Sequence, residues 1–205
     1  YKYRLLAYNL TTALNNRPNG YHPDALIFRF INNNDTGKRF ITRHGEGVTR
    51  VATALLLTLP GVPLIYTGDE YGLEFEPYQQ LETLIFEEEY PGLRDYHKKL
   101  ISLRKALPSL HSRNWQLIEP DAVPQAVYSY IRYGGPEDLP VMVLLNFSEE
   151  PSELEFDLPE EFESLQQSNL YDLLADEEVP AMSEGRMRIS VPALTARVLT
   201  AEPME

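Results

Sequence analysis

Residues 25–35, ALIFRFINNND, and residues 61–70, GVPLIYTGDE, share one pattern: a short apolar run rich in β-forming residues ends abruptly in polar side chains. Between the two runs, residues 47–59 (GVTRVATALLLTL) predict a buried helix that a Pro-Gly pair ends. Residues 94–107 predict a further helix with one apolar face, and a proline follows it. This order of strand, helix, strand and helix indicates parallel strands covered by helices, because strands buried on both faces are almost wholly apolar.

The second half of the chain has a different character. Of the 205 residues, 18 are Lys or Arg and 31 are Asp or Glu, a net charge of −13. Up to Pro108 there are 13 basic and 12 acidic residues, whereas from Ser109 onward there are 5 and 19. This sign of charge argues against binding to nucleic acid or to an anionic membrane surface. A solvated acidic surface explains the excess more simply than an acid-tolerant ligand site does.

Short β-rich runs separated by turns dominate this half of the chain and predict an antiparallel β-sandwich. The runs are residues 127–132, 140–147, 153–158, 186–191 and 196–200. We therefore expect an α/β part over residues 1–111 and an all-β domain over residues 112–205.

Composition excludes several kinds of site. The chain has no cysteine, which excludes disulfides, thiol catalysis and cysteine-ligated zinc. Its four histidines are scattered, and none has a carboxylate partner at ligand spacing, so we expect no metal site. No run reaches the roughly 20 apolar residues that a membrane-spanning helix needs.

Carboxylates at the ends of the two apolar runs are the candidates for chemistry. Asp35 follows the first run, and the pair Asp69 and Glu70 follows the second. In α/β barrels the working residues project from the carboxyl ends of the parallel strands. The spacing alone leaves a second interpretation open, because Asp and Asn also cap turns and helix starts.

Four motifs resemble the α-amylase family of glycoside hydrolases and transglycosidases, glycoside hydrolase family 13. Residues 30–35 (FINNND) resemble its F-x-x-N-H-D motif, and residues 61–70 resemble its G-x-P-x-x-x-x-G-x-E motif at the eighth barrel strand. Residues 100–110 resemble its last barrel helix. VYSYIRY and VMVLLNFS, within residues 127–148, resemble the start of its C-terminal β domain. The motifs occur in the family's order over nearly the whole chain.

The resemblance implies that the chain is a C-terminal fragment: about the last two βα units of a (β/α)8 barrel (residues 1–111) and the trailing antiparallel sandwich (residues 112–205). Asp35 corresponds to the third of the family's three carboxylates, which binds sugar hydroxyls and supports an oxocarbenium-like transition state. The nucleophile and the acid/base have no counterpart here. The implied function is a fragment of a glycosidase or transglycosidase acting on α-glucosidic bonds, inactive by itself.

The resemblance also suggests roles for residues around Asp35. Predicted substrate-binding residues are Asn33, Asn34, Arg39 and Tyr66, and Gly68 and Glu70 are expected to shape the loop. Two of these positions depart from the family pattern. Asn34 stands where the family has His and cannot carry a positive charge, and Arg39 lies one residue later than the commonest spacing. Both an enzyme of unusual specificity and a weakened relative fit these departures.

Expected partners are an α-glucan or oligosaccharide and the missing N-terminal part of the barrel. Strands without their barrel neighbours would leave open edges, so self-association is a further expectation. We expect no cofactor in this chain, although a calcium ion in the longer protein stays open. An alternative function is a carbohydrate- or protein-binding module, which a row of exposed aromatic residues on one sandwich face would distinguish. Tyr128, Tyr130 and Tyr133 are candidates for this row, and they fit core positions of the strands equally well.

Overall fold

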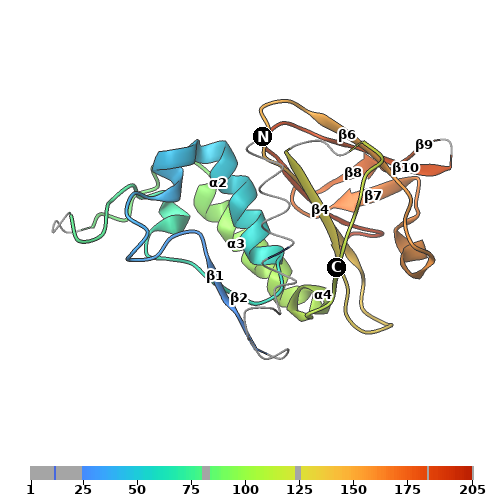
Figure 1. Ribbon diagram of the computed structural model, residues 1–205, viewed down its shortest axis with the longest axis horizontal. Helices are drawn as coiled ribbons and strands as arrows, with labels where there is room; N and C mark the ends of the chain where they lie inside the picture. Colours follow the sequence, from blue (N-terminus) through green and yellow to red (C-terminus); the bar gives the residue numbers. More distant parts are fainter. Residues whose placement is uncertain (1–11, 13–24, 80–83, 123–125, 184, 205) are drawn as a thin grey trace.

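The computed structural model describes residue 12 and residues 25–79, 84–122, 126–183 and 185–204 (Figure 1). Leucines at helical spacing also predict a helix over residues 3–14, and this segment, apart from residue 12, lies outside the described residues. The described chain consists of a parallel strand pair, two long helices and two antiparallel sheets. Figure 1 shows the helices between the strand pair and the sheets.

The first half forms a strand–helix–strand–helix unit. Its elements are β1 (Phe28–Phe30), α2 (Phe40–Thr58), β2 (Val62–Leu64), the 3-10 turn η1 (Asp69–Tyr71), α3 (Leu93–Ala106) and α4 (Pro108–His111). Strands β1 and β2 pair in parallel, with Phe28 opposite Val62, so the predicted parallel pairing is confirmed. Helix α3 matches its predicted bounds closely, whereas α2 begins earlier than residue 47. Gly45, with φ of +78°, joins a first turn of α2 to the apolar helix.

The second half forms two antiparallel sheets, as the sequence predicts. A six-stranded sheet has the order β3-β4-β5-β11-β7-β8, and a three-stranded sheet has the order β6-β10-β9. The strands are β3 (Trp115–Leu117), β4 (Val127–Arg132), β5 (Val141–Asn146), β6 (Ser152–Phe156), β7 (Asn169–Asp172), β8 (Glu177–Pro180), β9 (Met182–Ser183), β10 (Arg186–Val191) and β11 (Ala196–Thr200). The sequence predicts β4, β10 and β11 at these bounds but not β3, β7, β8 or β9.

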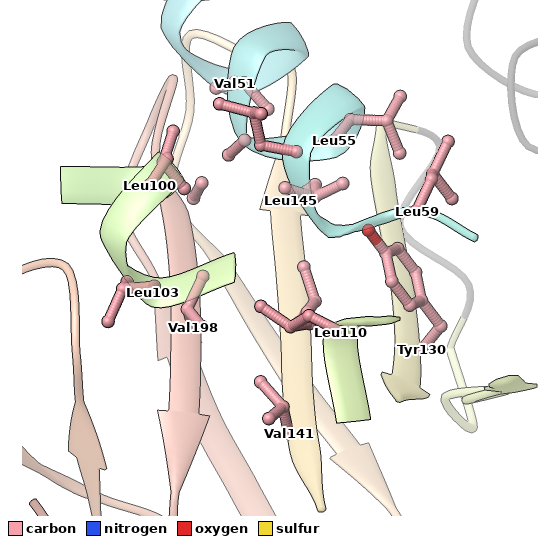
Figure 2. Close-up of a cluster of buried hydrophobic side chains, with 14 of the residues drawn as sticks. Val51, Leu55, Leu59, Leu100, Leu103, Leu110, Tyr130, Val141, Leu145 and Val198 are labelled. Atoms are coloured by element: carbon pink, nitrogen blue, oxygen red, sulfur yellow. The ribbon is translucent and has the colours of Figure 1, made fainter. Parts of the chain in front are cut away.

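The six-stranded sheet is covered on both faces. On one face, residues of α2 and α3 such as Val51 and Leu100 pack against Leu145 and Val198 of the sheet (Figure 2). On the other face, the three-stranded sheet contributes to a second apolar cluster that includes Met142 of β5. All six residues of β5 are buried, which explains its continuous apolar sequence. The predicted boundary between residues 111 and 112 therefore crosses a continuous core shared by helices and sheet.

Three arginines hold the turn between α2 and β2. Arg132 of β4, fully buried, donates to the carbonyl oxygens of Thr58, Leu110 and Ser112. Burial lowers the pKa of Arg132 to about 10. Arg104 donates to the carbonyls of residues 57, 59 and 61, and Arg29 donates to the carbonyl of residue 60. The carbonyl end of a helix carries partial negative charge, so these contacts stabilise the end of α2 and fix where β2 begins.

Candidate functional site

Asn32 closes the loop that follows β1. Its side chain is buried, and its Oδ1 accepts a hydrogen bond from the backbone N–H of Phe40 at 2.8 Å. Its Nδ2 donates to Asp69 Oδ1 at 2.7 Å. One amide therefore joins the end of β1, the start of α2 and the loop after β2.

Arg39 and Asp69 form a buried ion pair between the same two loops. The Arg39 guanidinium donates through Nη2 to Asp69 Oδ1 at 2.5 Å and to the carbonyl oxygen of Thr67 at 3.0 Å. Its centre lies 4.8 Å from the Tyr66 ring centroid and 4.7 Å from that of Phe75, so both rings contact the cation. Only 1% of the Arg39 side chain and 11% of the Asp69 side chain are exposed. The ion pair, together with Asn32, is called the Asp69 clamp below.

Burial dominates the electrostatics of Asp69. It raises the pKa of the carboxyl above its ordinary value, while the Arg39 charge and the hydrogen bonds from Asn32 and the Tyr66 N–H act in the opposite direction. Two nitrogens of Arg39, Nε and Nη1, have no hydrogen-bond partner among the described residues. The clamp is thus an enclosed support rather than an open binding surface.

Asp35 lies in a tight polar turn above the clamp, five residues beyond the end of β1. Its backbone N–H donates to Asn33 Oδ1 at 2.9 Å, and the Asn33 N–H donates to Thr36 Oγ1 at 3.1 Å. The Asn34 amide donates to Asp35 Oδ1 at 3.1 Å. Asn34 and Asp35 are both exposed, so a solute can reach their polar atoms.

The structure brings the predicted residues together in two groups. Asn33, Asn34 and Asp35 share the exposed turn, whereas Arg39 and Tyr66 lie in or against the clamp. A sugar contact by Arg39 stays a prediction, because its guanidinium is enclosed in this structure.

The two residues of the loop motif after β2 have distinct surroundings. Gly68 has φ of +82°, and a β-carbon there would lie 2.6 Å from Leu73 Cδ1, so both backbone and space favour glycine. Glu70 lines an open cleft of about 420 Å³ together with Tyr66, Arg94, His97 and Lys98. Its Oε2 is buried without a hydrogen-bond partner among the described residues.

His97 of α3 lies beneath this cleft. It is 3% exposed, and its Nδ1 donates to the carbonyl oxygen of Leu93 at 3.0 Å. Burial lowers the pKa of its imidazole, while the negative charges of Asp69 and Glu70 act to raise it. The neutral imidazole is therefore favoured in the folded chain.

The clamp residues Asn32 and Asp69 are absent from the predicted substrate-binding and loop-shaping residues. The sequence marks Asp69 as a carboxylate at a strand end, but the family motif includes its neighbour Glu70 and not Asp69. Asn32 is the first residue after the apolar run, and its amide has no counterpart among the motif's defined positions. The signal available in the sequence was a strongly polar residue directly after each apolar run.

The aromatic row expected for a binding module is not formed by Tyr128 and Tyr130. These side chains are 2% and 0% exposed and belong to the core shared with the helices. Figure 2 shows Tyr130 within this core. Tyr133 packs edge-on against Phe162, with ring centroids 5.3 Å apart. Tyr128 and Tyr130 therefore occupy the core positions that the sequence left open as the second interpretation.

The described ranges offer neither a metal-binding cluster nor a membrane-spanning helix. These residues contain no group of three or more His, Asp or Glu side chains placed to hold a metal ion. None of the helices described here is both long and apolar enough to cross a membrane.

Comparisons of sequence place the chain beside glucan-processing enzymes. No protein-family model matches it. In an alignment of 108 residues, 48% of this chain, it is 32% identical to the 1,4-alpha-glucan branching enzyme GlgB of Bacillus cytotoxicus and 32% identical to that of Bacillus anthracis. The chain spans 17% of the length of these curated relatives.

Comparisons of structure cover nearly the whole chain. Ttha1563 from Thermus thermophilus matches with a TM-score of 0.76 and 24% identity, covering 96% of this chain and 40% of that one. The α-amylase of Geobacillus thermoleovorans, solved with acarbose, matches with a TM-score of 0.74 and 22% identity, covering 94% and 42%. An Anoxybacillus α-amylase matches with a TM-score of 0.71 and 24% identity, covering 97% and 42%. At these identities the likeness shows the fold.

Proposed function

We propose, from the premise that this chain is related to the α-amylase family in sequence and fold, that it is the C-terminal part of an enzyme acting on α-glucosidic bonds. In this proposal Asp35 is the third carboxylate of the active site, and the chain contributes it to a hydrolysis or transfer reaction. The nucleophile and the acid/base come from the preceding part of the enzyme.

One observation carries this proposal: the loops after β1 and β2 are fastened together so that Asp35 is presented to solvent. Asn32 and the buried Arg39–Asp69 pair join the two loops, while the Asp35 residue that follows β1 is exposed. Loops after the carboxyl ends of parallel strands are where (β/α)8 enzymes place their working residues. If the turn after β1 served only to begin α2, it would not need the buried ion pair that joins Arg39 to Asp69 in the loop after β2.

We further propose that β1, α2, β2 and α3 are the last two βα units of a (β/α)8 barrel. Phe28, Phe30 and Leu64 share one face of the β1–β2 pair and are 65%, 45% and 36% exposed. Their exposure fits apolar side chains that fill the interior of a closed barrel in the longer protein. Helices α2 and α3 already cover the opposite side.

The chemistry proposed for Asp35 is electrostatic. Hydrogen bonds from a sugar ring's hydroxyls to its carboxylate would strengthen as positive charge develops at the anomeric carbon, which lowers the barrier more than it tightens ground-state binding. The Asn34 amide, bonded to Asp35 Oδ1, fixes the direction of the carboxylate. The Asn33 side chain holds the backbone of the turn.

The test compares Asp35→Asn with wild type in a longer protein that includes the preceding barrel. We expect kcat on a malto-oligosaccharide to fall by a factor on the order of 10²–10³, because a transition-state contact is lost, with the unfolding midpoint nearly unchanged. Asp95→Asn, which changes an exposed carboxylate of α3, is the matched control and should leave kcat unchanged. Wild-type turnover by Asp35→Asn would contradict the proposal.

A further inference from the structure

Tyr78 is exposed beside Asp35 in an unusual backbone conformation. Its side chain is 73% exposed, and its φ is +65°, in the region that favours glycine. For an aromatic L-residue this conformation is a genuine outlier that requires support from the surroundings. An exposed aromatic residue that is also conformationally strained is a candidate for function.

The support for Tyr78 comes from the Asp35 turn itself. The Asn34 Nδ2 donates to the Tyr78 hydroxyl oxygen at 2.7 Å, and the same nitrogen donates to Asp35 Oδ1 at 3.1 Å. One amide thus fixes the phenol ring and the carboxylate relative to each other. Because the Tyr78 oxygen accepts the bond from Asn34, its own O–H hydrogen stays available as a donor.

We propose that Tyr78 is a platform on which a sugar ring of an α-glucan stacks, with its hydroxyls directed to Asn34 and Asp35. This inference rests on the proposed function and deepens it by assigning a binding residue outside the four family motifs. An aromatic ring offers an apolar face to the C–H face of a sugar, and its hydroxyl stays in a polar setting. The Tyr78 O–H supplies a donor and the exposed Asp35 carboxylate supplies an acceptor, the combination that sugar hydroxyls require.

Charge favours a neutral ligand at this place. Asp35 lies next to the platform, so a phosphate or carboxylate group on a stacked ligand would meet a like charge. A nucleotide could stack on the ring, but its phosphates would be repelled, and a neutral oligosaccharide would not.

The experiment titrates the full chain, labelled with ¹⁵N, with maltoheptaose and follows the side-chain amide signals of Asn33 and Asn34. We expect saturable shifts in the wild-type chain and about tenfold weaker binding by Tyr78→Gly, the order expected when an aromatic anchor is removed. Glycine adopts φ of +65° without strain, so this variant should fold. Tyr78→Phe keeps the ring and should retain most of the affinity.

Phe86→Ala is the matched control, because Phe86 is another exposed aromatic residue but packs on Tyr71, with ring centroids 5.6 Å apart. It should bind as the wild type does. Equal binding by Tyr78→Gly and wild type overturns the platform and leaves the proposed function standing, since the latter depends on the kcat of Asp35→Asn. Absence of maltoheptaose binding by the wild-type chain, or AMP shifting the same signals in its place, also overturns the platform.

Discussion

Removing the Asp69 carboxylate should destabilise the chain far more than removing a surface carboxylate. Asp69→Ala deletes the counter-charge of Arg39, whose side chain is 1% exposed. It also deletes the acceptor for the Asn32 amide and for the backbone N–H of Tyr66. Arginine cannot lose its proton in the folded chain, so the charge stays buried and unpaired.

The expected loss is about 3–5 kcal/mol in the free energy of unfolding, the range for removing one partner of a buried ion pair. This is a large part of the roughly 5–15 kcal/mol that stabilises a typical domain. Arg39→Met should cost less, because burial already raises the pKa of Asp69 and the abandoned carboxyl can take up a proton. The double variant Asp69→Ala with Arg39→Met should recover part of the loss, because no unpaired charge remains.

Urea unfolding monitored by circular dichroism and by the fluorescence of Trp115 measures these free energies. Trp115 is the only tryptophan and packs against the core shared by helices and sheet, so its fluorescence reports on unfolding of the helices together with the sheet. Asp95→Ala is the control, since Asp95 is 80% exposed in its pair with Lys98, and it should cost less than about 1 kcal/mol. A loss below about 1 kcal/mol for Asp69→Ala, or no recovery in the double variant, would refute the reasoning.

Two further predictions concern pH and association. Because burial lowers the pKa of His97 below its ordinary value of 6.5, the unfolded chain binds more protons below that pH, and stability falls with falling pH. His97→Asn should therefore reduce the difference in urea midpoint between about pH 7.5 and pH 5, and an unchanged difference would contradict this assignment. The exposed Phe28 and Phe30 should drive concentration-dependent association of the chain, which light scattering detects. Phe28→Ser with Phe30→Ser should weaken it, and a wild-type chain that stays monomeric at every concentration would count against an uncovered strand face.

Burial on both faces explains which strands the sequence predicts. Strands β4 and β5 are buried along their whole length between the helices and the small sheet, so apolar and aromatic residues predominate in both. Strand β8 lies at an edge, and three of its four residues, Glu177, Glu178 and Pro180, are exposed. Charged residues and proline protect an edge from pairing with other chains, but they also remove the apolar pattern by which a strand is recognised. The missed strand therefore reflects its place in the sheet.

The start of α2 escaped prediction for a related reason. Its first turn, from Phe40 to Gly45, has only Ile41 fully buried, and Gly45 interrupts the helical backbone. Periodicity appears only after this glycine, where α2 packs against the sheet. The early turn is held instead by the Asn32 side chain and by Arg43, which donates to the carbonyls of Thr36 and Lys38. Such long-range and side-chain contacts have no periodic signature.

The two parts of the site also differ in whether their contacts are local or long-range in the sequence. Within the Asp35 turn, hydrogen bonds join residues at most three positions apart, and short motifs in the sequence capture contacts of this kind. The bond from Asn34 to Tyr78, 44 positions away, lies outside any such motif. The Asp69 clamp joins residues 30 and 37 positions apart, and its existence depends on the parallel pairing of β1 with β2. Two carboxylates, Asp69 and Glu70, follow β2, and the sequence alone does not show which of them contacts the loop after β1. The choice of Asp69 follows from the left-handed Gly68 before it, which turns the chain so that Asp69 Oδ2 also accepts the N–H of Tyr66. The short Asp69 side chain, whose carboxyl carbon is two bonds from Cα, fits that tight turn. The longer Glu70 side chain lines the cleft beside α3.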